Sequence, residues 1–536
     1  MKKLKLVCVA IAMAGAAPTF AGGLLTNTNQ HVAFNRMMSR EASIGIDGVY
    51  YNPAGVVFMG EGHHLAINWQ LAYQTRTINN DYKLFTNNVN NPITPRDFKG
   101  KAFAPVIPSF QYAYNKGKWS FQANFSLTGG GGKCTFDDGL GSFEKIVSET
   151  AIAACGLAGV VDQTLGNKLG QQGMEMFTSD QAFGKTGKYS FNSYMHGRQY
   201  YYGLSAGAAY KFCDNFSAFL GVRGVYALTN YYGYVENINV GNMPLYKVLD
   251  PTKENAANIE LSCDQTGVGF TPIIGVDYKT GRWNFSAKYE FKTRIRLKNK
   301  SVNQTPSIGN LPANLANQMT GILTDKFHNA GLPLEQAKQQ AESTTNAVLN
   351  DPTVGATMMG LKTQFDQKLN KAIGEYEDGK KIAGDIPGYL ALGIGYSPVD
   401  AVRVNVGFHW FDDKNATSYN NRNKELKRGT LEYNAGVEVD VNKKITLSTG
   451  WQNTNYGLSD EYMDDKSFVV GSNSAAIGGV YHINKKMDLN VAYFHTFYQH
   501  KKTSETVQLA ADNSIVYNSD YTRNNNVFAV GLDINF

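Results

Sequence analysis

Residues 283–298 read WNFSAKYEFKTRIRLK, and apolar and polar side chains alternate along this stretch. Successive side chains of a β-strand point to opposite faces, whereas a helix would scatter both sets around its axis. The stretch therefore predicts a strand with one apolar face and one charged face. The apolar face holds Trp283, Phe285, Ala287, Tyr289, Phe291, Ile295 and Leu297, interrupted only by Thr293, and the other face holds Asn284, Ser286, Lys288, Glu290, Lys292, Arg294, Arg296 and Lys298.

The same alternation recurs along the whole chain, in fourteen segments. Strands of soluble sandwiches usually run about 5–6 residues, whereas most of these segments have the length of a tilted span of the bilayer. The charged faces would line a wet interior. The segments are 64–78, 106–115, 119–128, 200–212, 216–235, 265–278, 283–298, 386–397, 401–412, 430–441, 445–456, 473–483, 487–500 and 525–536.

The connections between these segments alternate strictly between short and long, as the periplasmic turns and outer loops of outer-membrane barrels do. Aromatic residues such as Trp119, Tyr210 and Trp283 flank the short turns, where an interfacial girdle is expected. The last segment ends in Phe536, which resembles the insertion signal read by the barrel-assembly machinery. We therefore predict an all-β fold, a 14-stranded antiparallel transmembrane β-barrel, surrounded by lipid of a Gram-negative outer membrane.

The amino terminus has the pattern of a secretory signal peptide over residues 1–21. Lys2, Lys3 and Lys5 precede the short apolar stretch 6–17, and small residues at 19 and 21 offer a cleavage site. No other apolar run approaches the roughly 20 residues of a spanning helix. The formal net charge is only +6 and is spread out, so we expect no nucleic-acid partner.

Four cysteines remain after the signal segment, in an export route that permits disulfides. The predicted topology puts Cys213 in a periplasmic turn and the other three in outer loops, so Cys213 has no partner within reach. We expect Cys134 and Cys155 to form a disulfide within one loop. Their spacing does not suggest a zinc site, and we expect neither a metal nor a cofactor.

A short motif, Asn52-Pro53-Ala54-Gly55, lies before the first strand. Pro53 fixes its own φ and extends Asn52, while Gly55 tolerates unusual angles, so the motif makes a stiff corner beside a flexible point. In this place it resembles the FadL family of outer-membrane transporters of long-chain fatty acids and aromatic hydrocarbons. Asp385-Ile386-Pro387, which opens the eighth segment, and Gly393-Ile394-Gly395-Tyr396, which lies within it, agree with that resemblance.

The resemblance implies an organisation and a function. Residues 22–62 would form a hatch that plugs the barrel, and residues 63–536 the barrel itself, with loops 129–199 and 299–385 the longest. The chain would take up hydrophobic small molecules, most of all long-chain fatty acids, by loop capture, binding in the lumen and hatch-gated release. Gly129, Gly130, Gly131 and Gly132 follow the third strand, where the family has a sideways gap; a flexible loop start is the alternative.

Two sets of residues are candidates for ligand contact. An apolar groove among the loops would use Leu315, Met319, Ile322, Leu323 and Phe327, which lie at helical spacing, although these side chains would equally suit packing of helices on one another. An anionic head group would need a cation inside the barrel. The candidates are Arg223, Lys288, Lys292, Arg294 and Arg296, whose alternative role is the ordinary charged lining of a porin.

Other functions share parts of this pattern. A general or solute-selective porin would have the barrel without a hatch, and a surface adhesin would also use long loops. Energised metal-chelate receptors have 22 strands and a much larger plug, for which the chain is too short. No G-x-S-x-G elbow or Ser/His/Asp set is apparent, so we expect no enzyme activity.

Overall fold

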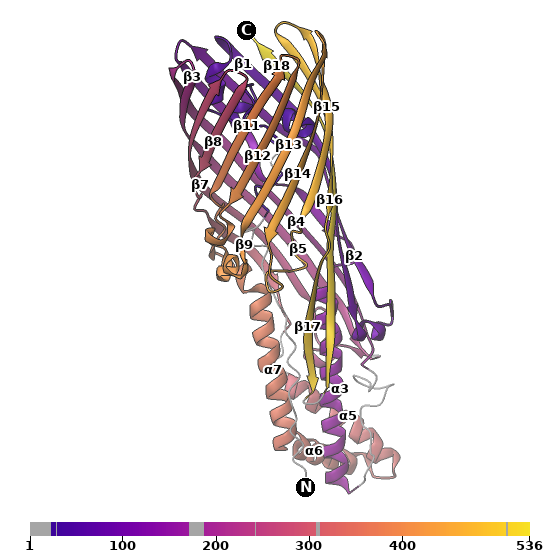
Figure 1. The fold of residues 1–536 in the computed structure, drawn as a ribbon. Coiled ribbons are helices and arrows are strands. Elements are labelled where there is room, and N and C mark those ends of the chain that lie inside the picture. Colours follow the sequence, from indigo (N-terminus) through magenta and orange to yellow (C-terminus); the bar gives the residue numbers. More distant parts are fainter. Residues whose placement is uncertain (1–22, 28, 171–186, 242, 307–310, 511–512) are drawn as a thin grey trace.

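Fourteen antiparallel strands close into a barrel in the part of the chain that the structure describes (Figure 1). The structure is a computed structural model, which describes residues 23–306 and 311–536 with gaps at 28, 171–186, 242 and 511–512. The predicted signal peptide lies outside the described residues. The 14-stranded barrel predicted from the sequence is confirmed, and pairing of the first strand with the last closes it.

Ten strand positions are filled by one element each. These are β1 (Gly62–Tyr82), β2 (Arg96–Lys116), β3 (Trp119–Phe136), β4 (Tyr189–Cys213), β5 (Phe216–Val240), β7 (Ile259–Thr280), β12 (Val402–Phe411), β13 (Arg428–Asn442), β14 (Ile445–Gly457) and β15 (Ser472–Asn484).

The remaining four positions include three broken strands. β8 (Trp283–Glu290) continues as β9 (Arg296–Gln304), β10 (Lys381–Ala383) as β11 (Tyr389–Val399), and β16 (Met487–Tyr498) as β17 (Lys501–Ala510). The last is β18 (Asn513–Asn535), and β6 (Met243–Pro244) only extends the edge of β5. Several strands reach further toward the long loops than predicted, and side chains in these extensions, such as Tyr82 of β1 and Val240 of β5, are buried in hydrophobic clusters.

The outer wall of the barrel is apolar over the expected bilayer span. On β7 the outward side chains Val268, Phe270, Ile274, Val276 and Tyr278 are all exposed. The inward side chains between them are buried in the barrel. A closed barrel satisfies every strand edge, so this wall suits a membrane, as in outer-membrane proteins.

The prediction of a single apolar face along 283–298 is wrong beyond Glu290. Lys288 and Glu290 point inward and are buried, but Thr293, Ile295 and Leu297 also point inward, so Arg294 and Arg296 face outward. The strand is interrupted between the end of β8 at Glu290 and the start of β9 at Arg296. Opposite this break β7 carries Pro272, which has no N–H to donate and only accepts from the Phe291 N–H at 3.0 Å.

The segment before β1 runs inside the barrel. It contains α1 (Val32–Arg36), α2 (Gly48–Tyr51) and the 3-10 turn η1 (Gly55–Phe58). Almost all of its side chains are buried, and α1 contacts β15, β16 and β18 while η1 contacts β3, β4 and β7. Contacts on opposite walls mean that this segment plugs the lumen; we call its described residues 23–61 the hatch.

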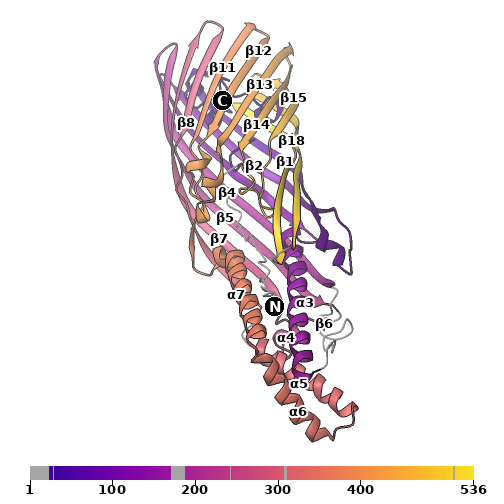
Figure 2. The ribbon, with the colours of Figure 1, turned by 60° about the horizontal axis from the view of Figure 1, so that its bottom comes forward.

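Helices gather at the long-loop end (Figures 1 and 2). They are α3 (Gly141–Leu169), α4 (Tyr246–Leu249), α5 (Leu311–Asn329), α6 (Leu334–Leu349) and α7 (Pro352–Ile373), with the 3-10 turns η2 (Lys83–Asn87), η3 (Gly374–Tyr376), η4 (Asp413–Asn415) and η5 (Tyr419–Glu425). By length and composition α3 could cross a membrane, but 56% of its most apolar window is buried against the other loop elements. Its apolar side chains thus belong to the loop cluster.

Candidate functional site

The motif Asn52-Pro53-Ala54-Gly55 fastens the hatch to three strands. The Asn52 side-chain amide donates to Asp277 of β7 at 2.6 Å. Gln122 of β3 donates to the Pro53 carbonyl, and Ser217 of β5 donates to the Ala54 carbonyl, both at 2.7 Å. A side chain at Gly55 would lie 2.4 Å from the Asn52 amide nitrogen, so this corner requires glycine.

Charged side chains inside the barrel hold the hatch as well. Arg223 and Lys288 both pair with Glu290, at 2.6 and 2.9 Å, and both lie over the ring of the hatch residue Tyr50. Lys288 also donates to the Tyr50 carbonyl at 2.7 Å. The predicted head-group candidates Arg223 and Lys288 are thus already engaged with the hatch.

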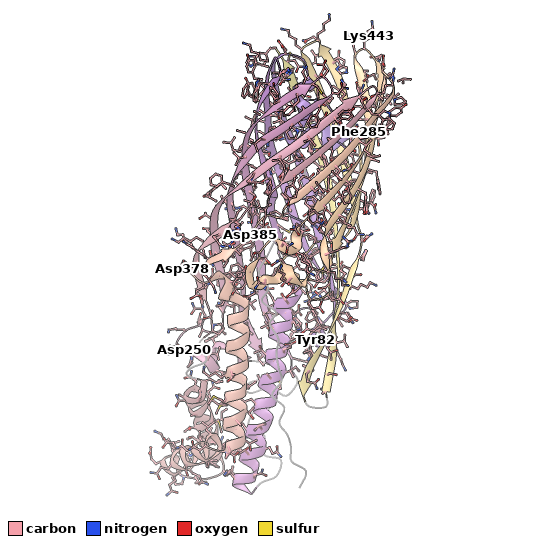
Figure 3. The ribbon with its side chains drawn as sticks, turned by 60° about the vertical axis from the view of Figure 1, so that its left-hand side comes forward. Tyr82, Asp250, Phe285, Asp378, Asp385 and Lys443 are labelled. Atoms are coloured by element: carbon pink, nitrogen blue, oxygen red, sulfur yellow. The ribbon has the colours of Figure 1, made fainter. Side chains whose placement is uncertain are left out.

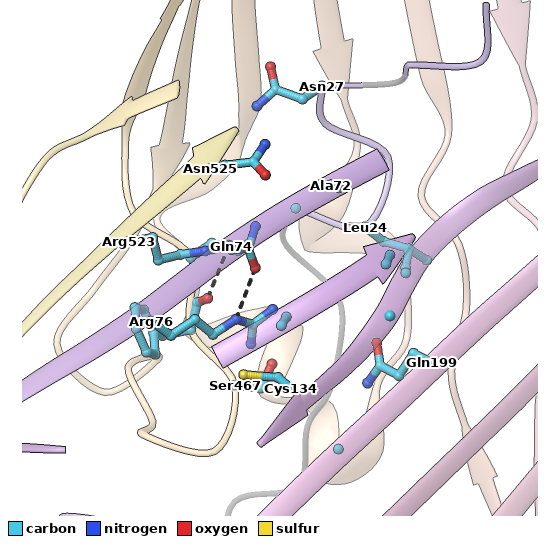
Figure 4. Close-up of a pocket in the computed structure, with 18 of the residues that line it drawn as sticks. Leu24, Asn27, Ala72, Gln74, Arg76, Cys134, Gln199, Ser467, Arg523 and Asn525 are labelled. Carbon is cyan, nitrogen blue, oxygen red and sulfur yellow. Dashed lines mark hydrogen bonds between the residues drawn. The ribbon is translucent and has the colours of Figure 1, made fainter. Parts of the chain in front are cut away.

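A cavity of about 230 Å³ lies between the end of the hatch and the barrel wall (Figure 4). We call it the inner cavity. The hatch contributes Leu24, Asn27 and Asn29, while Arg76 and Arg523 come from β1 and β18. Aromatic side chains of Phe136, Tyr231, Tyr456, Phe494 and Tyr498 line another part of it. The cavity therefore combines aromatic and aliphatic side chains with amides and cations.

Arg76 and Arg523 are direct cross-strand partners in the β1–β18 seam. Both share one acceptor, the Gln74 side-chain oxygen, at 3.3 and 2.8 Å (Figure 4). No Asp or Glu is among the described residues that line the cavity, and the Arg523 Nε has no hydrogen-bond partner in the described chain. Like charges directly opposite each other repel, so the pair favours an anion between them.

One side of the inner cavity is a break in the barrel wall. The β2–β3 ladder stops at the pair Ala102–Cys134 and resumes at Phe110–Phe125. Pro105 and Pro108 in this part of β2 have no N–H to donate, and the glycines of β3 add two register shifts against β4. Gly130 and Gly132 line the cavity from β3, and Ala102, Ala104 and Ile107 line it from β2.

The hatch covers this break from inside. Leu24 packs on Gly129, where an added Cβ would lie 2.6 Å from the Leu24 side chain. Gly130 has a φ of +78°, and a Cβ there would meet the Gln199 carbonyl at 2.4 Å. The predicted residues Gly129–Gly132 therefore lie in β3 at the break, and not in a loop start as the alternative had it.

A second cavity, of about 400 Å³, opens among the loops; we call it the outer cavity. Its walls are mainly apolar and aromatic, including Phe143, Ile146, Tyr234, Val235 and Tyr376. Met195, Tyr231 and Lys466 line both cavities. The two cavities thus adjoin, and together they lead from the loops to the break in the wall.

Comparison with known proteins identifies the architecture. No protein-family model matches the sequence, and no curated protein matches it. The fold matches that of a FadL homologue of Pseudomonas aeruginosa at a TM-score of 0.57 and 14% sequence identity, and the match covers 96% of this chain and 100% of that protein. The chain has a FadL-like fold. The deltaS2 mutant of TodX, a monoaromatic hydrocarbon channel, matches at a TM-score of 0.50 and 13% sequence identity. That match covers 95% of this chain and 100% of the mutant.

Several predicted site residues lie elsewhere in this FadL-like barrel. Leu315, Met319 and Leu323 are fully buried in the helical loop cluster, with Ile322 and Phe327 packed against it, so they do not line the outer cavity. Packing between helices, the alternative named for these residues, is what the structure has. The outer cavity is lined instead by strand ends, by the start of α3, by Ile373 and Tyr376, and by residues of the loop before β15 such as Asp460 and Met463.

The head-group prediction needs correction too. Arg294 and Arg296 are outside the barrel because of the break after β8, and Lys292 donates to the Asn415 carbonyl at 3.0 Å. Sequence reasoning missed Arg76 and Arg523. The sequence indicated part of this pair, since Arg76 lies on the inward-facing side of the predicted first strand. Arg523 lay just outside the predicted last strand.

The predicted disulfide is wrong. No disulfide joins Cys134 to Cys155, and neither Cys213 nor Cys263 is in one. Cys134 lies in β3 beside the inner cavity, whereas Cys155 lies within helix α3, which begins at Gly141. At 1.5 Å rise per residue, Cys155 is about 20 Å along that helix, far beyond the reach of a disulfide.

Proposed function

We propose that this chain is an outer-membrane channel that takes up hydrophobic small molecules, with long-chain fatty acids as its main substrate. The observation that carries the proposal is the Arg76–Arg523 pair in a cavity that also has aromatic and aliphatic walls and that ends at a break in the barrel wall. A molecule with an acyl tail and an anionic head matches both features.

Capture occurs first in the outer cavity. Its aromatic and aliphatic walls remove the tail from water, which is favourable at roughly 25 cal/mol per Å² of apolar surface. From there the ligand passes Met195 and Tyr231 into the inner cavity. The carboxylate then lies between Arg76 and Arg523, where charge-assisted hydrogen bonds hold it.

Release follows a sideways route through the β2–β3 break. Outside the wall at this level are the exposed side chains of Phe103 and Val106, so the tail leaves directly into an apolar environment. The amino-terminal end of the hatch must first move, because Leu24 packs on Gly129. Hatch-gated release therefore means displacement of the segment around Leu24, while the Asn52 corner stays fastened.

A disulfide across the break tests this route. The ideal Cβ of Gly132 lies 3.7 Å from the Ala104 Cβ, which suits a disulfide bond. In a Cys134→Ser background, we expect Ala104→Cys/Gly132→Cys to lose fatty-acid uptake by cells when oxidised and to regain it when reduced. Tyr112→Cys/Ala123→Cys, in the fully paired part of the same two strands, is the matched control.

Uptake that stays unchanged, with the disulfide formed in full by mass spectrometry, would refute the sideways route. Cells carrying the unmodified chain must also take up more fatty acid than cells carrying an empty vector. Near-zero conductance in a planar bilayer would separate this channel from a porin, since the hatch fills the lumen.

An aromatic hydrocarbon is the second candidate substrate. Tyr231, Tyr232, Tyr234 and Tyr376 line the outer cavity, and flat rings stack well on such walls. The hydrocarbon has no head group, so its uptake would be indifferent to loss of the Arg76–Arg523 pair. Uptake of toluene and of a fatty acid by the same variants therefore distinguishes the two substrates.

A further inference from the structure

Strand β9 presents a row of cations on the outside of the barrel. Arg294, just before the strand, and Arg296, Lys298 and Lys300 within it are all exposed, and they alternate with the buried Ile295, Leu297 and Asn299. Side chains two residues apart on one strand face are about 6.6 Å apart. The row is thus continuous along the outer wall.

The row begins where the hydrocarbon layer ends. From Trp283 to Phe291 the outward side chains are apolar, and this stretch matches the roughly 9–11 residues of a tilted span. On the neighbouring β7 the exposed apolar series ends at Val268, and the next outward residue, Thr266, pairs with Lys298. Both strands therefore place the cations at the level of the lipid head groups on the long-loop side.

Strand β10 adds a further cation to this row. Lys381 is exposed and lies directly opposite Lys298. We call Arg294, Arg296, Lys298, Lys300 and Lys381 the basic row. Like charges directly opposite each other destabilise a sheet unless an anion lies near them.

Few carboxylates neutralise the basic row. Arg296 pairs with the buried Asp385 at 2.8 Å, at the level where the barrel meets the loop helices (Figure 3). Asp264 is the cross-strand partner of Lys300, but its carboxylate accepts a hydrogen bond from the Asn230 side-chain amide at 2.8 Å. Within the described residues, Arg294, Lys298, Lys300 and Lys381 have no ion pair within 4.0 Å.

We propose that the basic row binds the phosphate groups of a phosphorylated glycolipid of the outer leaflet, of the lipid A type. Arginine forks match phosphate oxygens, and lysines add point charges at the membrane surface. The row continues directly from the apolar wall at Val268 and Phe270, which are 59% and 67% exposed. An amphiphile with acyl chains beside that wall and phosphates at its head contacts both surfaces, whereas a soluble anion contacts only the cations.

Native mass spectrometry and titration of the purified full chain in detergent test the proposal. The probes are bis-phosphorylated lipid A, its dephosphorylated form and inorganic phosphate. We expect Arg294→Gln/Lys298→Gln/Lys300→Gln/Lys381→Gln to bind bis-phosphorylated lipid A at least about tenfold more weakly. The control Lys83→Gln/Lys99→Gln/Lys101→Gln/Lys502→Gln removes the same number of exposed cations, four, from another part of the barrel.

Charge-conserving replacement by Lys298→Arg/Lys300→Arg/Lys381→Arg should retain binding. Equal affinity for the dephosphorylated lipid, equal loss in the control variant, or unchanged binding by the glutamine variant would each overturn the proposal. Tight binding of inorganic phosphate that excludes lipid A would also overturn it, in favour of a soluble anion. None of these measurements depends on transport, so the result is independent of the proposed uptake function.

Discussion

Replacing Arg523 by glutamine should separate recognition of the head group from recognition of the tail. Arg523 faces Arg76 across the β1–β18 seam, donates to Gln74 at 2.8 Å and has an unpartnered Nε, so its guanidinium has donors to spare for a ligand. A hydrogen bond to a charged group contributes roughly 1.5–3 kcal/mol. Each 1.4 kcal/mol is about tenfold in affinity.

We therefore expect Arg523→Gln to raise the Kd for hexadecanoate by about 10- to 100-fold. The Kd for hexadecanol, which has the same tail and no charge, should change by less than about threefold. Displacement of a fluorescent fatty acid from the purified protein measures both. Arg294→Gln, which removes an exposed cation outside the barrel, is the matched control.

Equal weakening of both ligands would mean that the variant has only disturbed the cavity wall. No weakening of either ligand would refute the head-group site. An unchanged melting temperature shows that the β1–β18 seam is intact, so a failure of folding is not mistaken for a loss of binding.

Three further predictions concern the hatch and the loops. Gly55→Ala should break the hydrogen bond between Asn52 and Asp277 and weaken docking of the hatch by about 1–3 kcal/mol, which faster proteolysis of the hatch would reveal. The control Gly60→Ala should have no effect, because nothing lies within 4 Å of the new Cβ. Glu290→Gln should leave the buried Arg223 and Lys288 without a carboxylate, lower stability by about 3–5 kcal/mol in thermal unfolding and raise barrel conductance. An unchanged melting temperature would argue against a stabilising role of these two ion pairs. Burial raises the pKa of the Glu375 carboxyl in η3 to about 8, so the folded loop holds this proton more tightly than the unfolded chain and loses stability as pH rises from the ordinary value toward 8. The protection of amides around η3, measured relative to the intrinsic base-catalysed exchange rate at each pH, should therefore be lower at about pH 9 than at about pH 6, and Glu375→Gln should remove that difference.

Part of the site could have been found without the structure. Pro105 and Pro108 in the second strand and the glycines of the third are each poor partners in a ladder, and their adjacency indicates a weak seam. The face switch after Glu290 was not visible, because Thr293 appears in the sequence as a single exception to the alternation. Its cause is Pro272 on a neighbouring strand, a contact that only the register supplies.

The sequence by itself determined the strand count, the topology and the plugged barrel. Alternation with a period of two is a local property, since each side chain must face either lipid or lumen wherever the strand is placed. A short motif before the first strand was enough to indicate the hatch by resemblance.

Only the tertiary structure decided which side chains form the site. Arg523 meets Gln74 and Arg76 although 449 residues separate it from Gln74, because closing the barrel joins the first strand to the last. The same closure set Arg223 and Lys288 against the hatch, whereas the break opposite Pro272 turned Arg294 and Arg296 to the outside. Cross-strand register is a property of pairs of segments, so the pattern of one strand cannot reveal it.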